Sequence, residues 1–252
     1  MIRSDLTGLV LAHGDRDVVP TIASLEPIYD QVVIVNDLHN PVTWSRDQLS
    51  DSYTGAVTSV DRFFDTFPEQ RNAGLEKALG GWVLVVDSDE TVSPQLIDEL
   101  KELVPRVDTN VFVLPRREVI RGRELERVRI GGPHPRLFRS HLRYASEPIV
   151  HERLQDWKPH DVGVLKGHLL HQRQDSISDL LRREFRYGKT FGAFDVDGVQ
   201  PISWPKLIKQ TIGDFTKRGG LSEGVSGIIG TTANASSNLG EKLARSSRRP
   251  KS

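Results

Sequence analysis

The residues best suited to chemistry lie in segment 82–90, which reads Trp-Val-Leu-Val-Val-Asp-Ser-Asp-Glu. The apolar run predicts a short buried strand that ends on Asp87, with Asp89 and Glu90 just beyond it. Ligands bind open α/β sheets at the carboxyl edge of the strands, and carboxylates there can hold a divalent cation that in turn holds a phosphate. An acidic turn that caps the next helix is the plainer interpretation. Paired carboxylates that close a wholly apolar strand favour a phosphate-binding site.

Strands and helices alternate in the first half of the chain. The expected strands lie at residues 8–12, 31–35, within 41–59, and at 82–86 and 111–114. The expected helices lie at residues 21–29, at 69–79 with Gly80-Gly81 as the stop signal, and from Ser93-Pro94 onward, where Ser is the N-cap and Pro the first helical residue. This alternation is typical of an α/β fold with a mostly parallel sheet flanked by helices.

The pattern changes after Pro115. Short strands are expected at 136–139 and 162–165, followed by a helix that Ser176 or Ser178 caps, and by helices broken by glycines from residue 202. We therefore expect three parts. The expected parts are a catalytic domain over 1–200, a C-terminal helical extension over 201–244, and a disordered basic tail over 245–252.

The composition excludes several classes of protein. Lys+Arg and Asp+Glu are equal at 34 each, so the molecule has no overall positive field to attract nucleic acid. The absence of cysteine excludes disulfides and thiolate metal sites. No stretch approaches the ~20 apolar residues of a membrane span, and the apolar run at 9–12 is too short for a signal-peptide core. A cytoplasmic protein is therefore expected.

Several short motifs succeed one another along the chain. The motifs are Gln-Arg-Asn-Ala-Gly at 70–74, Gly-Gly-Trp at 80–82, Asp-Ser-Asp-Glu at 87–90, Pro-Arg-Leu-Phe-Arg at 135–139, Val-His-Glu at 150–152, the histidines at 168 and 171, and a glycine-rich segment at 219–227. In this order they resemble glycosyltransferase family 2, and most of all its bacterial lipopolysaccharide-core β-glucosyltransferase subgroup. The resemblance runs from about residue 71 to 243. It implies a GT-A (Rossmann-like) fold, a nucleotide-sugar donor and a divalent metal, Mn²⁺ or Mg²⁺.

The resemblance also implies a role for individual residues. Asp89 would coordinate the metal, Asp87 would hold the ribose or a metal-bound water, and Arg71 would face the nucleotide. The chemistry agrees, since the charge that develops on a leaving diphosphate needs a cation, and a guanidinium suits a base edge or a phosphate. For Arg71 an exposed helix arginine is an equally good interpretation.

Glu152 is the candidate general base of this reaction. Inverting transfer needs a carboxylate that removes the proton of the acceptor hydroxyl, and the neighbouring His151 would orient the acceptor or share that proton. A solvated residue at a strand end is the alternative for Glu152. Of the two histidines that follow, we expect His171 to complete the metal shell or contact the diphosphate, and His168 to be structural.

Further candidates lie on two other strands. Arg136 and Arg139 are expected to share one strand face, where they would meet phosphate or solvent. Asp37, at the end of the second strand, is expected to contact the nucleotide base. The chain departs from the family here, because His13-Gly14-Asp15 and residues 36–40 replace the usual Asn-Glu pair and the usual Asp-x-x-Ser-x-Asp motif. The identity of the nucleotide therefore stays open.

The acceptor is the least defined part of the prediction. The segment 116–129 holds six Arg and three Glu, which predicts either a salt-bridged surface hairpin or a site for an acidic acceptor. The basic tail and the helices after residue 202 would allow peripheral contact with an anionic membrane.

The sequence favours a metal-dependent, inverting glycosyltransferase of the hexosyltransferase type, acting on a hydroxyl of a glycan or other acceptor. The alternatives are the same fold acting on another polymer such as nucleic acid, a nucleotide-sugar-binding module without turnover, and a metal-dependent phosphohydrolase. A phosphohydrolase would need more carboxylates near the site than this chain offers.

Overall fold

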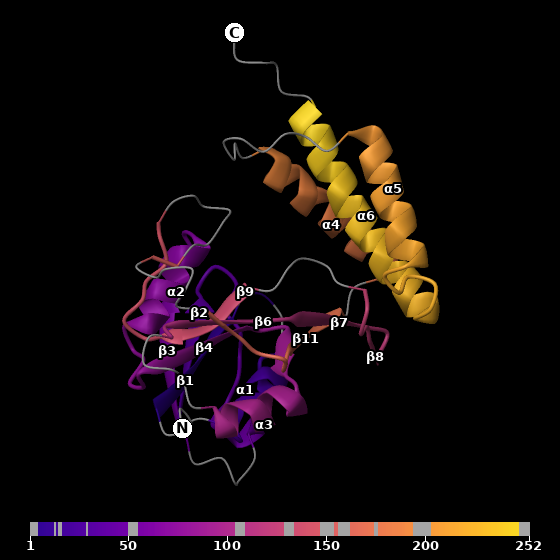
Figure 1. Ribbon diagram of the computed structural model, residues 1–252. Coiled ribbons are helices and arrows are strands. Elements are labelled where there is room, and N and C mark those ends of the chain that lie inside the picture. Colours follow the sequence, from indigo (N-terminus) through magenta and orange to yellow (C-terminus); the bar gives the residue numbers. More distant parts are fainter. Residues whose placement is uncertain are drawn as a thin grey trace. The chain divides into compact units, whose positions relative to one another are not determined.

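The computed structural model describes residues 5–12, 14, 17–28, 30–49, 55–103, 109–128, 134–146, 154–155, 162–173, 176–193 and 203–246. Figure 1 shows the elements along the chain. The chain divides into two compact units, of which unit 1 comprises Met1–Arg116 and Pro133–His171, and unit 2 comprises Arg117–Gly132 and Gln172–Ser252. The domain boundary that we expect near residue 200 stays a prediction.

Unit 1 is built on a seven-stranded sheet with the strand order β10-β6-β9-β4-β1-β2-β3. Its strands are β1 (Leu6–Ala12), β2 (Gln31–Asp37), β3 (Ala56–Arg62), β4 (Trp82–Asp87), β6 (Val111–Leu114), β9 (His134–Arg139) and β10 (Val162–Val164). Strand β9 runs antiparallel to its neighbours β4 and β6, whereas the pairs β1–β2, β1–β4, β2–β3 and β6–β10 are parallel. The predicted α/β fold with a mostly parallel sheet is confirmed.

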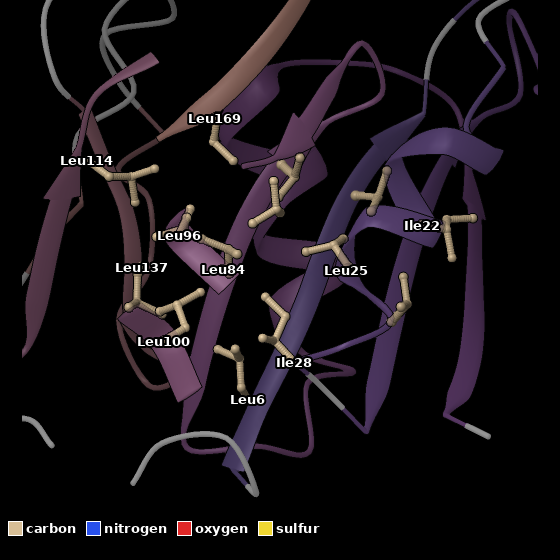
Figure 2. Packing of buried hydrophobic residues seen from close by; sticks show 14 of the residues in the cluster. Leu6, Ile22, Leu25, Ile28, Leu84, Leu96, Leu100, Leu114, Leu137 and Leu169 are labelled. Carbon is tan, nitrogen blue, oxygen red and sulfur yellow. The ribbon is translucent and has the colours of Figure 1, made fainter. Parts of the chain in front are cut away.

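Three helices cover the two faces of this sheet. Helices α1 (Val19–Leu25) and α3 (Pro94–Glu102) pack with the side chains that β1, β2 and β4 send to one face, and α2 (Phe67–Leu75) packs on the other. Within β4, Leu84 belongs to the first layer and Val85 to the second, as the alternation of a strand requires. Figure 2 shows the first layer, in which Ile22 and Leu96 belong to the helices and Leu84 to the sheet. Each fully buried side chain of this size contributes about 1.5–3 kcal/mol.

Helix α3 begins as predicted, because the Ser93 Oγ accepts a hydrogen bond from the Leu96 amide at 3.2 Å. Helix α2 is shorter than predicted and ends at Leu75 instead of running to residue 79. Beyond Leu75 the buried side chain of Gln31 forms hydrogen bonds with backbone groups of the chain. It donates to the Lys77 carbonyl and accepts from the Leu79 amide, both at 2.9 Å. These hydrogen bonds from a β2 side chain replace those of a last helical turn. The spacing of apolar residues along the chain does not reveal such a contact.

Helix α2 lies close to the sheet at Gly74. A Cβ atom there would lie 2.3 Å from Leu9 Cδ1 and 2.7 Å from Val35 Cγ2, both buried. We therefore expect Gly74→Ala to lower the free energy of unfolding by about 1–3 kcal/mol through overpacking. Denaturant unfolding measures this. Gly213→Ala is the matched control, because nothing lies within 4 Å of a Cβ at Gly213 on a helix, and it should raise stability by about 0.5–1 kcal/mol. Equal effects of the two changes would contradict the close packing of α2.

A short strand pair extends unit 1 beyond the large sheet. Strand β5 (Glu90–Val92) follows β4 after a two-residue turn and pairs antiparallel with β11 (Leu169–Arg173). The register sets Leu169 opposite Val92 and His171 opposite Glu90. This pairing brings β11, the strand that follows β10, next to the end of β4.

The described part of unit 2 consists of three helices and a hairpin whose first residue, Arg116, still belongs to unit 1. The hairpin is formed by β7 (Arg116–Ile120) and β8 (Arg123–Glu124), and the helices are α4 (Ile177–Ala193), α5 (Trp204–Thr216) and α6 (Gly224–Ser246). The apolar core of unit 2 consists of Ile120, Leu125, Val128, Leu180, Ile229 and Ala233. Helices α4 and α6 lie unusually close at Gly188 and Gly240, where an added Cβ would fall 1.8 Å and 2.2 Å from carbonyl oxygens of the other helix. No described helix is long and apolar enough to cross a bilayer.

The Arg-rich segment forms a salt-bridged hairpin, one of its two predicted outcomes. Arg117 pairs with Glu124 across the hairpin. The segment after the hairpin is tied to the start of α6 by Glu223, whose buried carboxylate accepts hydrogen bonds from the backbone amides of residues 126, 127 and 128. Unit 2 is thus held by polar contacts as well as by its apolar core.

Candidate functional site

The candidate site lies at the carboxyl end of β4 and is built entirely from unit 1. The turn after Asp87 is fixed from two sides. The Ser88 amide donates to the Leu11 carbonyl at 3.1 Å, and the Thr21 Oγ1 lies within hydrogen-bond distance of the carbonyls of Ser88 (3.1 Å) and Glu90 (2.8 Å). The neighbouring strand β1 and helix α1 therefore hold the loop that carries both aspartates.

Asp87 is bound by two arginines from different elements. Arg71 of α2 places Nη2 3.3 Å from Asp87 Oδ1, and Arg136 of β9 places Nη2 2.9 Å from Asp87 Oδ2. Both guanidiniums are nearly buried, whereas 31% of the Asp87 side chain remains exposed. Burial alone would raise the pKa of Asp87, but Arg136 and Arg71 outweigh it and hold the pKa well below its usual range. Asp87 is therefore a fixed carboxylate.

Glu90 is a third acid of the site, and sequence reasoning gave it no role. It is fully buried; its Oε2 accepts the Asp87 amide at 3.2 Å, and its Oε1 lies 3.3 Å from Arg136 Nη2 and 3.7 Å from Arg116 Nη1. Burial raises the pKa of Glu90, and Arg136 only partly offsets this. Its role could have been predicted from its position at the start of a buried strand, because a buried carboxylate needs a cation beside it.

Asp89 and His171 form the outer part of the site. His171 Nε2 lies 3.2 Å from Asp89 Oδ2, and the β5–β11 register that sets His171 opposite Glu90 brings it there. His168 occupies a different place, because its backbone amide and carbonyl bond the Oγ and amide of Ser93, the N-cap of α3. The structure thus joins Asp89 with His171, the histidine preferred from the sequence.

The prediction that Arg136 and Arg139 share a strand face is wrong. Residues three apart on a strand point to opposite faces. Arg136 turns toward the carboxylates, whereas the Arg139 guanidinium lies 4.2 Å from the centre of the Trp82 ring, within the first core layer. Only Arg136 belongs to the site.

The interpretation of Arg71 as an exposed helix arginine is also wrong, because Arg71 is buried. Its guanidinium lies 5.3 Å from the ring centre of Tyr144, a residue that sequence reasoning missed. The Asn72 side chain fixes Tyr144 by two hydrogen bonds, each 2.9 Å long, to its backbone amide and carbonyl. Burial raises the pKa of the Tyr144 hydroxyl. Tyr144 therefore packs beside Arg71 as a neutral aromatic ring.

Asp37 lies at the same sheet edge as Asp87, on β2, with β1 between the two strands. Adjacent strands are about 4.8 Å apart, so the ends of β2 and β4 are roughly 10 Å apart. The Asp37 Oδ1 accepts the amides of His39 at 2.9 Å and Phe64 at 3.1 Å. These bonds shape the loop after β2, and contact of Asp37 with a nucleotide base stays a prediction.

His151 and Glu152 lie outside the described residues, as do His13 and Asp15. The predicted general base is therefore not placed in the site by the structure.

The charges of the described site nearly cancel. Three carboxylates, those of Asp87, Asp89 and Glu90, lie among the guanidiniums of Arg71, Arg116 and Arg136. Within the described part of the chain no cluster of three or more His, Asp or Glu side chains has the arrangement of a metal site. A cation here would have Asp89 and His171 as its ligands from the described residues.

The chain has an α/β sheet with a cluster of carboxylates and arginines at its carboxyl edge, and its fold is of the GT-A type. Residues 61–181 match the model of the family described as glycosyl transferase family 2. This segment contains α2, β4 and β9 and every described site residue except Asp37. Residues 61–181 are therefore similar to glycosyltransferase family 2 domains.

Among solved structures, the chain is similar to TarS from S. aureus. One crystal structure of TarS gives a TM-score of 0.47 at 13% identity over 97% of this chain, and this chain spans 55% of that protein chain. A structure of TarS residues 1–349 in complex with UDP-GlcNAc gives a TM-score of 0.46 at 12% identity, with 96% of this chain and 90% of that chain covered. The strand order and register define the fold, and the similarity to the family lies in residues 61–181.

Proposed function

We propose that this protein transfers a sugar from a nucleotide-sugar donor to a hydroxyl of a glycan or other acceptor, with a divalent cation, Mn²⁺ or Mg²⁺, as cofactor. The observation that carries the proposal is the convergence of Asp87, Asp89 and His171 at the sheet edge within the family-matched segment. The inverting outcome, the hexosyl type and the lipopolysaccharide-core β-glucosyltransferase subgroup belong to this proposal on the strength of the motif resemblance.

The charge balance supports the cation. A nucleotide diphosphate adds two or more negative charges to a site in which three carboxylates and three guanidiniums already offset one another. Leaving these charges uncompensated next to buried carboxylates is costly. A divalent ion supplies Lewis-acid stabilisation of the leaving diphosphate.

The site residues divide the remaining work among them. Asp89 and His171 would hold the cation, and His171 must be neutral at Nε2 to do so. Arg71 and Arg136 keep Asp87 ionised and fixed, so that its exposed part is available to the ribose or to a cation-bound water. Glu90 anchors Arg136 and Arg116 from behind the site. Glu152 would remove the proton of the acceptor hydroxyl.

The role of Glu152 can be separated from donor binding. We expect Glu152→Gln to lower kcat for transfer by about 10²–10⁴-fold, the range that general base catalysis supplies, and to leave the donor Kd unchanged. Steady-state transfer assays and calorimetric titration of the donor measure the two quantities. Glu76→Gln, at the C-terminal end of α2, is the control for loss of one carboxylate. Full transfer activity in Glu152→Gln would show that another group is the base.

The same assays separate the alternative functions. A protein that binds nucleotide sugars but releases no nucleotide with any acceptor is a binding module. Transfer to a nucleic acid, in preference to glycan acceptors, would identify the other polymer as the acceptor.

A further inference from the structure

The helices α5 and α6 of unit 2 carry large apolar side chains on their exposed surface. On α5 the exposed residues Trp204, Ile208 and Ile212 recur every fourth position and form one stripe. On α6 the exposed large hydrophobic residues are Val225, Ile228, Leu239 and Leu243, and at about 100° of rotation per residue they fall within one narrow sector. Each helix therefore has an apolar stripe that the described part of unit 2 does not cover.

The two helices run antiparallel. Lys242, near the end of α6, places Nζ 5.3 Å from the ring centre of Trp204 at the start of α5. Asn234, nearer the middle of α6, has its side-chain amide 3.3 Å from Asp214 Oδ2, near the end of α5. These two contacts fix both the direction and the facing sides of the pair.

Both stripes lie on the same side of this pair. On α6 the stripe is turned by roughly 110° from Asn234 and Lys242, and on α5 it is turned by roughly 120°, in the same sense, from Asp214. Trp204 lies at the edge of the α5 stripe that is nearest to α6. Because the two helices run antiparallel, stripes that are turned by similar angles in the same sense on each helix point to the same side of the helix pair. Helix α4 packs on the other side, against Ser237 and Gly240 of α6. The seven exposed side chains of the two stripes form a single surface, which we name the α5–α6 face.

The segment that carries the α5–α6 face has an excess of positive charge. Residues 203–246 contain six Lys and Arg and three Asp and Glu. All three acids are engaged within unit 2, since Asp214 pairs with Arg218, Glu241 pairs with Arg245, and buried Glu223 accepts backbone amides. On α5, by contrast, Lys206 and Lys209 are exposed, and so is Lys217 just after it. At about 100° of rotation per residue, Lys209 lies beside the apolar stripe, whereas Lys206 and Lys217 lie on the opposite side of α5.

We infer that the α5–α6 face docks the protein on an anionic lipid bilayer surface. Helices that lie in the membrane interface combine an apolar face containing Trp and Ile with Lys on the polar side. The long side chain of Lys209, beside the stripe, can reach the lipid headgroups while the apolar stripe is immersed. Trp204 suits this depth because its ring is both apolar and able to donate a hydrogen bond. The excess positive charge of residues 203–246 would disfavour symmetric pairing of two copies and would favour an anionic surface, so the charges favour lipid.

Co-sedimentation with vesicles tests this inference on the full-length protein. We expect binding to vesicles of phosphatidylcholine with phosphatidylglycerol, and little binding to vesicles of phosphatidylcholine alone. Ile208→Asn with Ile212→Asn should lower the partition coefficient by at least about tenfold, because two exposed side chains lose their burial in lipid. Lys209→Gln should lower it by about fivefold, which corresponds to about 1 kcal/mol for one charge near the surface.

Leu79→Asn is the matched control, because Leu79 is an exposed apolar residue of unit 1, whereas the α5–α6 face belongs to unit 2, and it should leave partitioning unchanged. Circular dichroism checks that each variant is folded. Failure to bind anionic vesicles would overturn the inference, and so would binding that Leu79→Asn weakens as much as the paired Ile variant does. A dimer in solution that dissociates in the Ile variant, without vesicle binding, would assign the face to a second copy. Donor turnover needs no membrane, so loss of vesicle binding with intact turnover separates this inference from the proposed function.

Discussion

Asp89→Asn should lower kcat/KM for the donor by at least about a hundredfold, the effect expected when one charge-stabilising group is removed from the position where charge develops. Asp89 is the partly exposed carboxylate that lies 3.2 Å from His171 Nε2, and an amide is a much weaker ligand for a hard cation. The activity should also require a higher Mn²⁺ concentration for half-saturation. Assays of nucleotide release over a range of Mn²⁺ concentrations measure both effects.

Asp98→Asn is the control for this change, because Asp98 is an exposed acid on α3 whose carboxylate lies 3.9 Å from Lys101. It should leave kcat/KM and the Mn²⁺ dependence unaltered. If Asp89→Asn kept most of the wild-type activity at every Mn²⁺ concentration, then Asp89 would not be a cation ligand.

Arg136→Met should cause the largest loss of stability, about 3–5 kcal/mol, because it leaves two carboxylates without their shared buried cation. Arg136 Nη2 is 2.9 Å from Asp87 and 3.3 Å from Glu90, and the side chain is about 10% exposed. Arg139→Met is the matched control on the same strand. Arg139 lies over Trp82, so its loss should cost only about 0.5–1 kcal/mol. Urea unfolding at neutral pH measures both.

The stability of the wild type and that of Arg136→Met should respond differently to pH, because Glu90 has a raised pKa in the wild type but Asp87 has a lowered one. In the wild type Asp87 has a lowered pKa, so its contribution to stability is present above its unfolded-state pKa and is lost as the pH falls through the folded-state pKa. In Arg136→Met both carboxylates should have raised pKa values, so protonation would favour the folded state. The stability gap between the two proteins should therefore narrow from pH 8 to pH 5. A constant gap over this range would show that Arg136 does not neutralise these carboxylates.

The sheet was predictable because each of its central strands is marked by a short apolar run in the sequence. The runs at β1, β2 and β4 are apolar without interruption and alternate with helices, and this pattern specifies buried parallel strands. The end of α2 was not predictable in this way. It depends on Gln31, more than 40 residues earlier, and no periodicity along the chain encodes that contact.

The site was predictable where it follows a strand end and unpredictable where it depends on packing. Asp87 and Asp89 are found from the apolar run that precedes them. The pairing of Arg71 with Asp87 depends on how α2 lies on the sheet, so the sequence left two interpretations of Arg71 equally good. Arg139 was expected on the same face as Arg136, but alternation along a strand places residues three apart on opposite faces.

The most direct test of the central claim is the release of nucleotide from UDP-, GDP-, dTDP- and CMP-sugars by the wild-type protein, with Mn²⁺ and with EDTA in its place. We predict that at least one donor releases its nucleotide with Mn²⁺, that EDTA abolishes this release, and that Asp89→Asn lacks it. Absence of release from every donor, or release that is unchanged by EDTA and by Asp89→Asn, would contradict a metal-dependent glycosyltransferase site at the end of β4.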